Sequence, residues 1–142
     1  MLNFFKKKPR TLREHLNYIV ENPKLRFQLD FYRNNQVDFQ LIRQSMLNSI
    51  DFKGIKDPSG LAFSITFNSE KDKNEQSHKN FINSTLFKKS KKINLGGDTF
   101  IILTGNNYED MDNIIHTLQK EIYNVDYDKS SSFVFNKIGN NR

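Results

Sequence analysis

The sequence contains no cysteine and no run of apolar residues long enough to cross a membrane. Without cysteine the chain forms no disulfide, thiolate metal site or cysteine nucleophile, which fits a reducing compartment. The first ten residues, MLNFFKKKPR, place their charges after the apolar residues and lack the long apolar region of a secretory signal peptide. We therefore expect a cytoplasmic protein without a transmembrane segment.

Aromatic residues are plentiful in this otherwise polar chain. Only 36% of the 142 residues are hydrophobic, but 13 Phe and 5 Tyr supply large side chains for a buried core. We expect a single domain over residues 11–138, after a basic N-terminal segment, 1–10, and before a frayed tail, 139–142. Residues 68–80 include no apolar side chain, so they are predicted to form a long exposed loop or the outer part of a mobile helix.

The first half of the domain begins with a clear helix signal. The residues TLRE form a capping box, with Thr11 as the N-cap and Glu14 three positions later, and the predicted helix ends before Pro23. Residues 24–33 alternate between apolar and polar side chains, which predicts a strand with one wet face. The side chains that point inward are Leu25, Phe27, Leu29 and Phe31.

Residues 38–50 fit two patterns. Phe39, Ile42, Met46 and Ile50 have helical spacing, and Asp38 is a suitable N-cap. The alternative is a strand that completes a hairpin and ends near Arg43, because the apolar residues around Phe39 also alternate. We favour the helix.

The second half predicts further strands and a long amphipathic helix. Strands are expected at 61–68, around 93–95, at 99–103 and at 133–138, with a short helix near 81–87. Asn107 or a neighbour caps the long helix, whose apolar stripe is Met111, Ile115, Leu118 and Ile122. The predicted fold class is α+β, a mostly antiparallel sheet with helices packed on one face, ending in a β-β-α-β unit.

The stretch LGGDTFIIL (95–103) is the most specific local pattern. Gly96-Gly97 between two apolar runs predicts a two-residue hairpin loop. The stretch also resembles the signature hairpin of diguanylate cyclases, the GGDEF family, in which glycines contact a guanine nucleotide and acids serve metal and catalysis. Gly96, Gly97, Asp98 and Phe100 match, but Thr99 replaces the glutamate, and Asn68 stands where the upstream metal-binding aspartate is expected. The resemblance thus implies a related layout over the last third of the chain without cyclase activity.

No catalytic or metal site can be assembled from the sequence, and no cofactor is predicted. Asp112 and His116 are four residues apart on the long helix, but a working metal site needs at least three protein ligands. The first turn of that helix also carries Glu109 and Asp110, which repel a phosphate. We therefore expect a protein that is not an enzyme.

Net charge is +6 and is concentrated in the first third of the chain. Our first hypothesis is a small protein-binding protein, such as an adaptor, an immunity or antitoxin-like protein or a complex subunit. The second is a binder of nucleic acid or an anionic membrane surface, and the third is a degenerate, inactive nucleotide-binding domain. The residues predicted to contact an anion or partner are Lys6, Lys7, Lys8, Arg10, Arg13, Arg26, Lys88, Lys89, Lys91 and Lys92.

Overall fold

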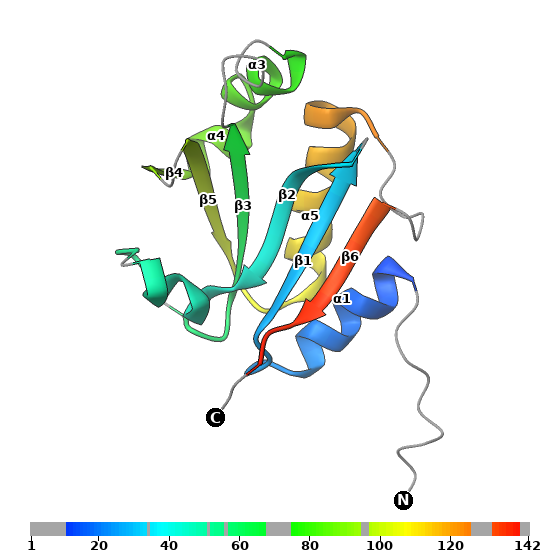
Figure 1. The fold of residues 1–142 in the computed structure, drawn as a ribbon, viewed down its shortest axis with the longest axis vertical. Helices are drawn as coiled ribbons and strands as arrows, with labels where there is room; N and C mark the ends of the chain where they lie inside the picture. The colour runs from blue at the N-terminus through cyan, green and yellow to red at the C-terminus, as the bar shows by residue number, and fades with distance from the viewer. Residues whose placement is uncertain are drawn as a thin grey trace, which may run out of the picture.

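The computed structural model describes residues 11–33, 35–50, 52–55, 57–67, 75–94, 97–125 and 132–139. The basic N-terminal segment 1–10, residues 68–74 and residues 140–142 lie outside these ranges. The predictions made for them therefore fall outside the described residues. The described residues form a six-stranded sheet with several helices (Figure 1), which confirms the predicted α+β class.

Every pair of neighbouring strands in the sheet is antiparallel. The spatial order is β4-β5-β3-β2-β1-β6, so β4 and β6 are the edge strands. β5 lies between β4 and β3. The strands are β1 (Phe27–Arg33), β2 (Gln36–Arg43), β3 (Leu61–Phe67), β4 (Lys91–Asn94), β5 (Asp98–Thr104) and β6 (Phe133–Lys137).

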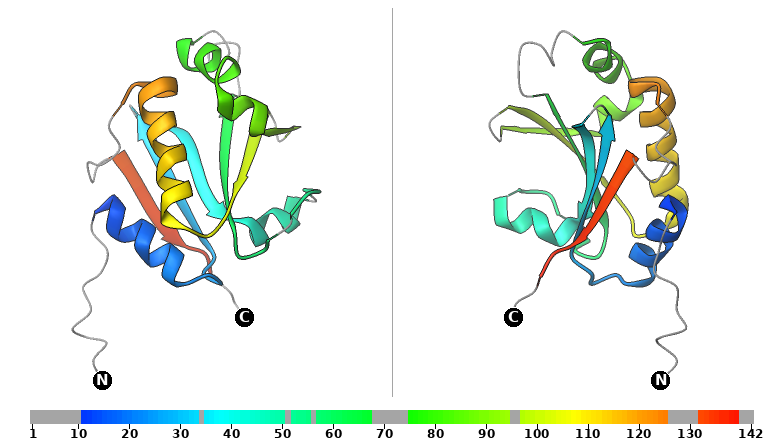
Figure 2. Two further views of the ribbon diagram at one scale, coloured as in Figure 1. Left: turned by 180° about the vertical axis from the view of Figure 1, so that it is seen from behind. Right: turned by 45° about the vertical axis from the view of Figure 1, so that its right-hand side comes forward.

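One face of the sheet carries most of the helices, and a smaller element lies on the other face (Figure 2, right). The first face is covered by α1 (Leu12–Glu21), α3 (Gln76–Ile82), α4 (Thr85–Lys89), α5 (Tyr108–Thr117) and its π-helical continuation η3 (Leu118–Tyr123). The 3-10 helix η2 (Gln44–Ile50) packs on the opposite face, where Leu47 and Phe52 cover Ala62 and Ile101.

The alternation predicted for the strands places the large side chains under the helices. Phe27, Leu29 and Phe31 of β1 are fully buried, as are Phe63 and Ile65 of β3. The first helix has the predicted capping box, in which the Thr11 hydroxyl accepts from the Glu14 N–H and the Glu14 carboxylate accepts from the Thr11 N–H. The sequence pattern therefore accounts for the main core, because residues two apart on a strand share one face.

The helix favoured for residues 38–50 is wrong, and the hairpin alternative describes the chain. Residues up to Arg43 belong to β2, and 3-10 turns begin only at Gln44. As a strand, β2 sends Phe39 and Leu41 into the core beneath the helices, where Phe39 stacks on Phe31 with ring centroids 4.3 Å apart. This cross-strand packing outweighs the helical spacing, which would have placed Phe39 and Ile42 together on one face.

Two further predictions need correction. The segment 68–80 was expected to be exposed, as a loop or as the outer part of a helix, but α3 begins at Gln76 and buries Ser77 to 7% exposure. The β4–β5 hairpin forms as expected, but Asn94 pairs with Asp98, so residues 95–97 lie between the paired positions instead of a two-residue loop. Leu95 and Gly96 themselves lie outside the described residues.

A buried arginine, Arg43, connects several loops at one end of the sheet. The Arg43 side chain is fully buried and donates hydrogen bonds to the carbonyl oxygens of Ile19, Asn22, Leu25 and Ser59 and to Asn106 Oδ1, at 2.8–3.1 Å. Burial lowers the pKa of this guanidinium, and the Asp57 carboxylate opposes that effect. Arg43 thus joins the end of α1 to the loops that precede β3 and α5.

Candidate functional site

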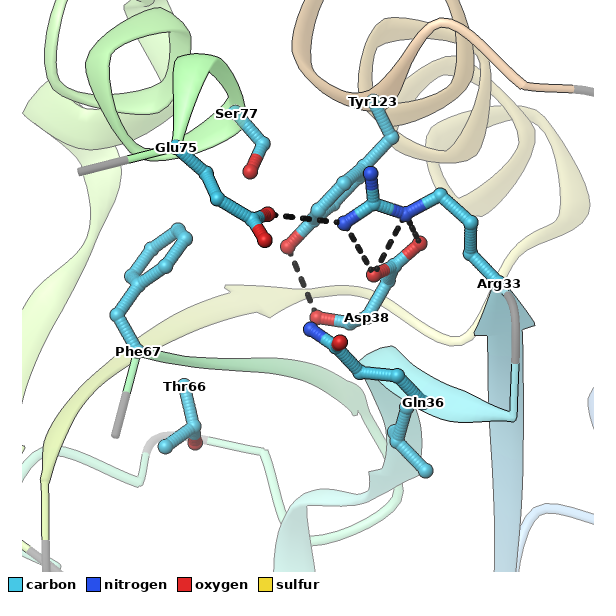
Figure 3. Close-up of a pocket in the computed structure, with 9 residues that line it drawn as sticks. Arg33, Gln36, Asp38, Thr66, Phe67, Glu75, Ser77 and Tyr123 are labelled. Carbon is cyan, nitrogen blue, oxygen red and sulfur yellow. Dashed lines mark hydrogen bonds and ion pairs between the residues drawn. The ribbon is translucent and has the colours of Figure 1, made fainter. Parts of the chain in front are cut away.

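The sheet splits between its two middle strands, and a small polar pocket lies in the split (Figure 3). The β2–β3 pairing ends at Gln40 and Ser64, although β2 begins at Gln36 and β3 continues to Phe67. In Figure 1 the two strands diverge toward the end of the sheet where α3 lies. The hollow measures about 10 Å³, which is close to the room that one water molecule needs.

A β-bulge places the acidic residue of this pocket. Phe31 pairs with Phe39 and Tyr32 pairs with Val37, so Asp38 is an extra residue in β2. The bulge lets the Asp38 side chain point to the same side as that of Phe39, where it is only 1% exposed. Figure 3 shows its carboxylate facing the Arg33 side chain from the neighbouring strand.

Arg33 joins two carboxylates. Its Nε lies 3.2 Å from Asp38 Oδ2 and its Nη2 lies 3.2 Å from Asp38 Oδ1, which is a two-pronged contact. The same Nη2 lies 3.3 Å from Glu75 Oε2, and the Arg33 and Glu75 side chains are each about one-third exposed. Burial lowers the pKa of Arg33, but the Asp38 and Glu75 carboxylates together raise it above its ordinary value.

Tyr123 of η3 supports this ion-pair cluster from the helical layer. Its hydroxyl donates to the backbone carbonyl of Asp38 at 2.9 Å. The Arg33 guanidinium lies over the Tyr123 ring, with its carbon Cζ 5.5 Å from the ring centroid. Because the strands have parted, the Asp38 carbonyl faces a side chain here instead of β3. The cluster therefore binds β1, β2, α3 and η3 together.

The contacts in this pocket indicate a structural role for its residues rather than a catalytic one. Both carboxylate oxygens of Asp38 are in contact with Arg33, and the hollow has no room for a substrate larger than water. Among the described residues, no group of three His, Asp or Glu side chains is placed to hold a metal ion. Asp112 and His116, the pair considered from the sequence, form an exposed contact of 3.3 Å on α5.

Four of the predicted lysines gather at one edge of the sheet. Lys88 and Lys89 occupy the last turn of α4, and Lys91 and Lys92 belong to the edge strand β4. All four are exposed, and we call them the lysine edge. Within it, Lys92 Nζ lies 3.4 Å from Asp98 Oδ1. Asp98, the acid of the cyclase-like stretch, therefore serves as a partner for a lysine.

The loop that follows η2 contacts the lysine edge. The Lys91 ammonium donates to the Lys53 carbonyl oxygen at 2.6 Å and lies 5.2 Å from the centroid of the Phe52 ring. These contacts fix the stem of Lys91 against η2 and its loop, while the side chain remains at the surface.

The other predicted contact residues do not join this group. Lys6, Lys7, Lys8 and Arg10 lie outside the described residues. Arg13 lies on α1 with its guanidinium 5.0 Å from the Tyr108 ring centroid, and Arg26 precedes β1. Four strand spacings separate β4 from β1, or about 19 Å at roughly 4.8 Å each, so the described cations do not form a single patch.

Comparisons with known proteins give no further guide to the site. No family model matches the chain, and neither a curated protein nor a solved structure matches it. In the part of the chain that is described, no helix combines the length and apolar character needed to cross a bilayer.

Proposed function

We propose that this chain is a non-enzymatic protein-binding protein, an adaptor, immunity-type protein or complex subunit, whose lysine edge recognises an acidic partner protein. The observation that carries this proposal is the position of Lys91 and Lys92 on an edge strand, next to Lys88 and Lys89 of α4. β4 pairs with β5 on one side only, and its other side has no strand partner in the described sheet.

An edge strand can bind an extended segment by adding it to the sheet. The main-chain groups of β4 supply hydrogen bonds, and the flanking side chains select which segment is accepted. Lysines on an edge oppose pairing with a second lysine-rich edge, because like charges repel. The same lysines attract a segment that carries Asp or Glu, and this attraction raises the rate of encounter.

A protein partner fits this edge better than a nucleic acid. Proteins that bind single strands on a sheet combine cations with exposed aromatic rings that stack on the bases. Of the aromatic side chains at this edge, Phe52 and Phe100 are only 8% and 4% exposed, and Phe87 of α4 is partly buried against the main core. The described edge therefore offers positive charge and strand hydrogen bonds without a stacking surface.

The test uses an extended peptide with glutamate at alternate positions and a matched peptide with glutamine. We expect the glutamate peptide to shift the NMR amide signals of residues 91–94 saturably, to slow their hydrogen exchange, and to bind more weakly as salt rises. The double variant Lys89→Glu/Lys92→Glu should weaken binding at least about tenfold, which corresponds to about 1.4 kcal/mol. The control Lys79→Glu/Lys120→Glu makes the same charge change at exposed positions of α3 and η3.

The proposal fails if both double variants weaken binding equally, since net charge would then explain it. It also fails if the peptides do not bind while a single-stranded oligonucleotide or an anionic phospholipid vesicle binds at the lysine edge. Binding of the glutamine peptide with the same affinity as the glutamate peptide would likewise exclude recognition by charge.

A further inference from the structure

A second buried carboxylate lies on the face of the sheet opposite the main helices. Leu29 and Phe31 of β1 point into the helix-covered core, so Asp30 between them points to the other face. β1 is flanked by β2 and β6, and the Asp30 residue is only 6% exposed. Asp30 is not among the residues predicted from the sequence to contact a partner.

Two glutamines donate hydrogen bonds to this carboxylate. Gln28 Nε2 lies 3.1 Å from both carboxylate oxygens, and Gln40 Nε2 donates to Oδ1 at 2.8 Å. Within the described residues, no Lys, Arg or His forms an ion pair with Asp30. A buried aspartate is usually paired, because taking an isolated negative charge out of water is costly.

The two glutamines also determine what the surface presents. Each donates its amide N–H₂ to Asp30, so its amide oxygen is left as an acceptor, and neither oxygen has a hydrogen-bond partner in the described part of the chain. The site therefore combines one negative charge with two amide oxygens. Such a group of acceptors matches a ligand that only donates hydrogen bonds.

The surroundings leave this site on an uncovered part of the sheet. η2 packs near Ala62 and Ile101, on the side of the sheet toward β3 and β5. Asp30 pairs across the strands with Val134 of β6, which is 44% exposed. In Figure 2 (right) η2 lies beside the lower part of the sheet and no helix of the described chain covers this face above it.

We propose that Gln28, Asp30 and Gln40 form a site for a basic side chain of a partner protein, with arginine preferred over lysine. An arginine guanidinium has five donors in a planar fork and no acceptor, so it can satisfy the carboxylate and both amide oxygens together. Its charge compensates Asp30, and its apolar stem lies against Val134. The proposal is independent of the lysine edge, which takes acidic residues.

N-acetyl-L-arginine amide is the probe, and N-acetyl-L-citrulline amide is its neutral counterpart of nearly the same shape. We expect the arginine compound to shift the NMR side-chain amide signals of Gln28 and Gln40 saturably, with at least about tenfold weaker binding of citrulline. Asp30→Asn keeps the shape and removes the charge, so it should weaken arginine binding to the level of citrulline. Asp112→Asn, on α5, removes the same charge elsewhere and should leave binding unchanged.

Equal binding of the two compounds to the wild-type protein would overturn the proposal without use of any variant. Undiminished arginine binding by Asp30→Asn, or no saturable shift at Gln28 and Gln40, would overturn it as well. The lysine-edge experiment reads the amides of residues 91–94, so failure of one proposal is distinguishable from failure of the other.

Discussion

Two buried aspartates on neighbouring strands have opposite roles in this fold. Asp38 of β2 lies on the helix-covered side and makes a two-pronged contact with Arg33. Asp30 of β1 lies on the other side and, among the described residues, accepts hydrogen bonds only from two neutral glutamines. Their residue exposures are similar, at 3% for Asp38 and 6% for Asp30. Burial alone therefore does not distinguish a charge that stabilises the fold from a charge that can bind a partner.

The difference lies in what each charge is bound to. A carboxylate bound to an arginine is already compensated, and removal of Asp38 leaves the Arg33 guanidinium with only the partly exposed Glu75 carboxylate as a partner. A carboxylate bound to neutral amides keeps its charge for another molecule, and its removal relieves a desolvation cost. Variants of the Asp38 cluster should consequently alter stability, whereas variants at Asp30 should alter binding.

Asp38→Asn should give the largest loss of stability. Removing one partner of a buried ion pair costs about 3–5 kcal/mol, and we expect about 2–3 kcal/mol because the Arg33 side chain is 29% exposed. Urea denaturation at neutral pH measures this loss, with Asp112→Asn as the matched control on an exposed face. A loss no larger than that of the control would show that the fold does not depend on this charge.

Tyr123→Phe should have an intermediate effect. The variant removes the hydroxyl that donates to the Asp38 carbonyl at 2.9 Å, but it keeps the ring that stacks on Phe39. Loss of one buried hydrogen bond predicts about 1–2 kcal/mol in the same denaturation experiment. An effect as large as that of Asp38→Asn would mean that the hydroxyl, and not the ion pair, holds the bulge in place.

Glu75→Gln should cost less than about 1 kcal/mol, because both side chains of its ion pair with Arg33 are partly exposed to water. Glu75 is the N-cap residue of α3, but its side chain makes no capping hydrogen bond, so the variant does not change the cap. The small difference from wild type should shrink as salt is raised. A large loss that persists at high salt would place Glu75 with Asp38 among the charges on which the fold depends.

The fold was largely predictable because its signals are local. Alternation identified β1 and β3, and the capping box identified the start of α1. Residues 38–50 were misassigned because two periodicities overlap there, and only packing of Phe39 on Phe31 decides between them. The spacing of apolar residues within 38–50 carries no information about this cross-strand contact, which forms only when β2 pairs with β1.

The sites were harder to predict because they depend on strand register. Gln28 and Asp30 are two residues apart on one strand, so the sequence places them on the same face. The donor from Gln40 depends on its pairing with Asp30, and the position of Asp38 depends on a bulge. The four lysines of the lysine edge were predicted from the sequence as contact residues. Their position at the edge of the sheet follows only from the strand order. Register and order are set by tertiary packing, which one sequence does not reveal.

The most direct test compares Asp30→Asn with Asp38→Asn in parallel urea denaturation. Asparagine at position 30 keeps an oxygen for the two glutamine donors and removes the buried charge, so the free energy of unfolding should stay within about 0.5 kcal/mol of wild type or rise slightly. Asp38→Asn should lose about 2–3 kcal/mol under the same conditions. Equal losses for the two variants would contradict the account, because both charges would then be committed to the fold and Asp30 would not be free for a partner.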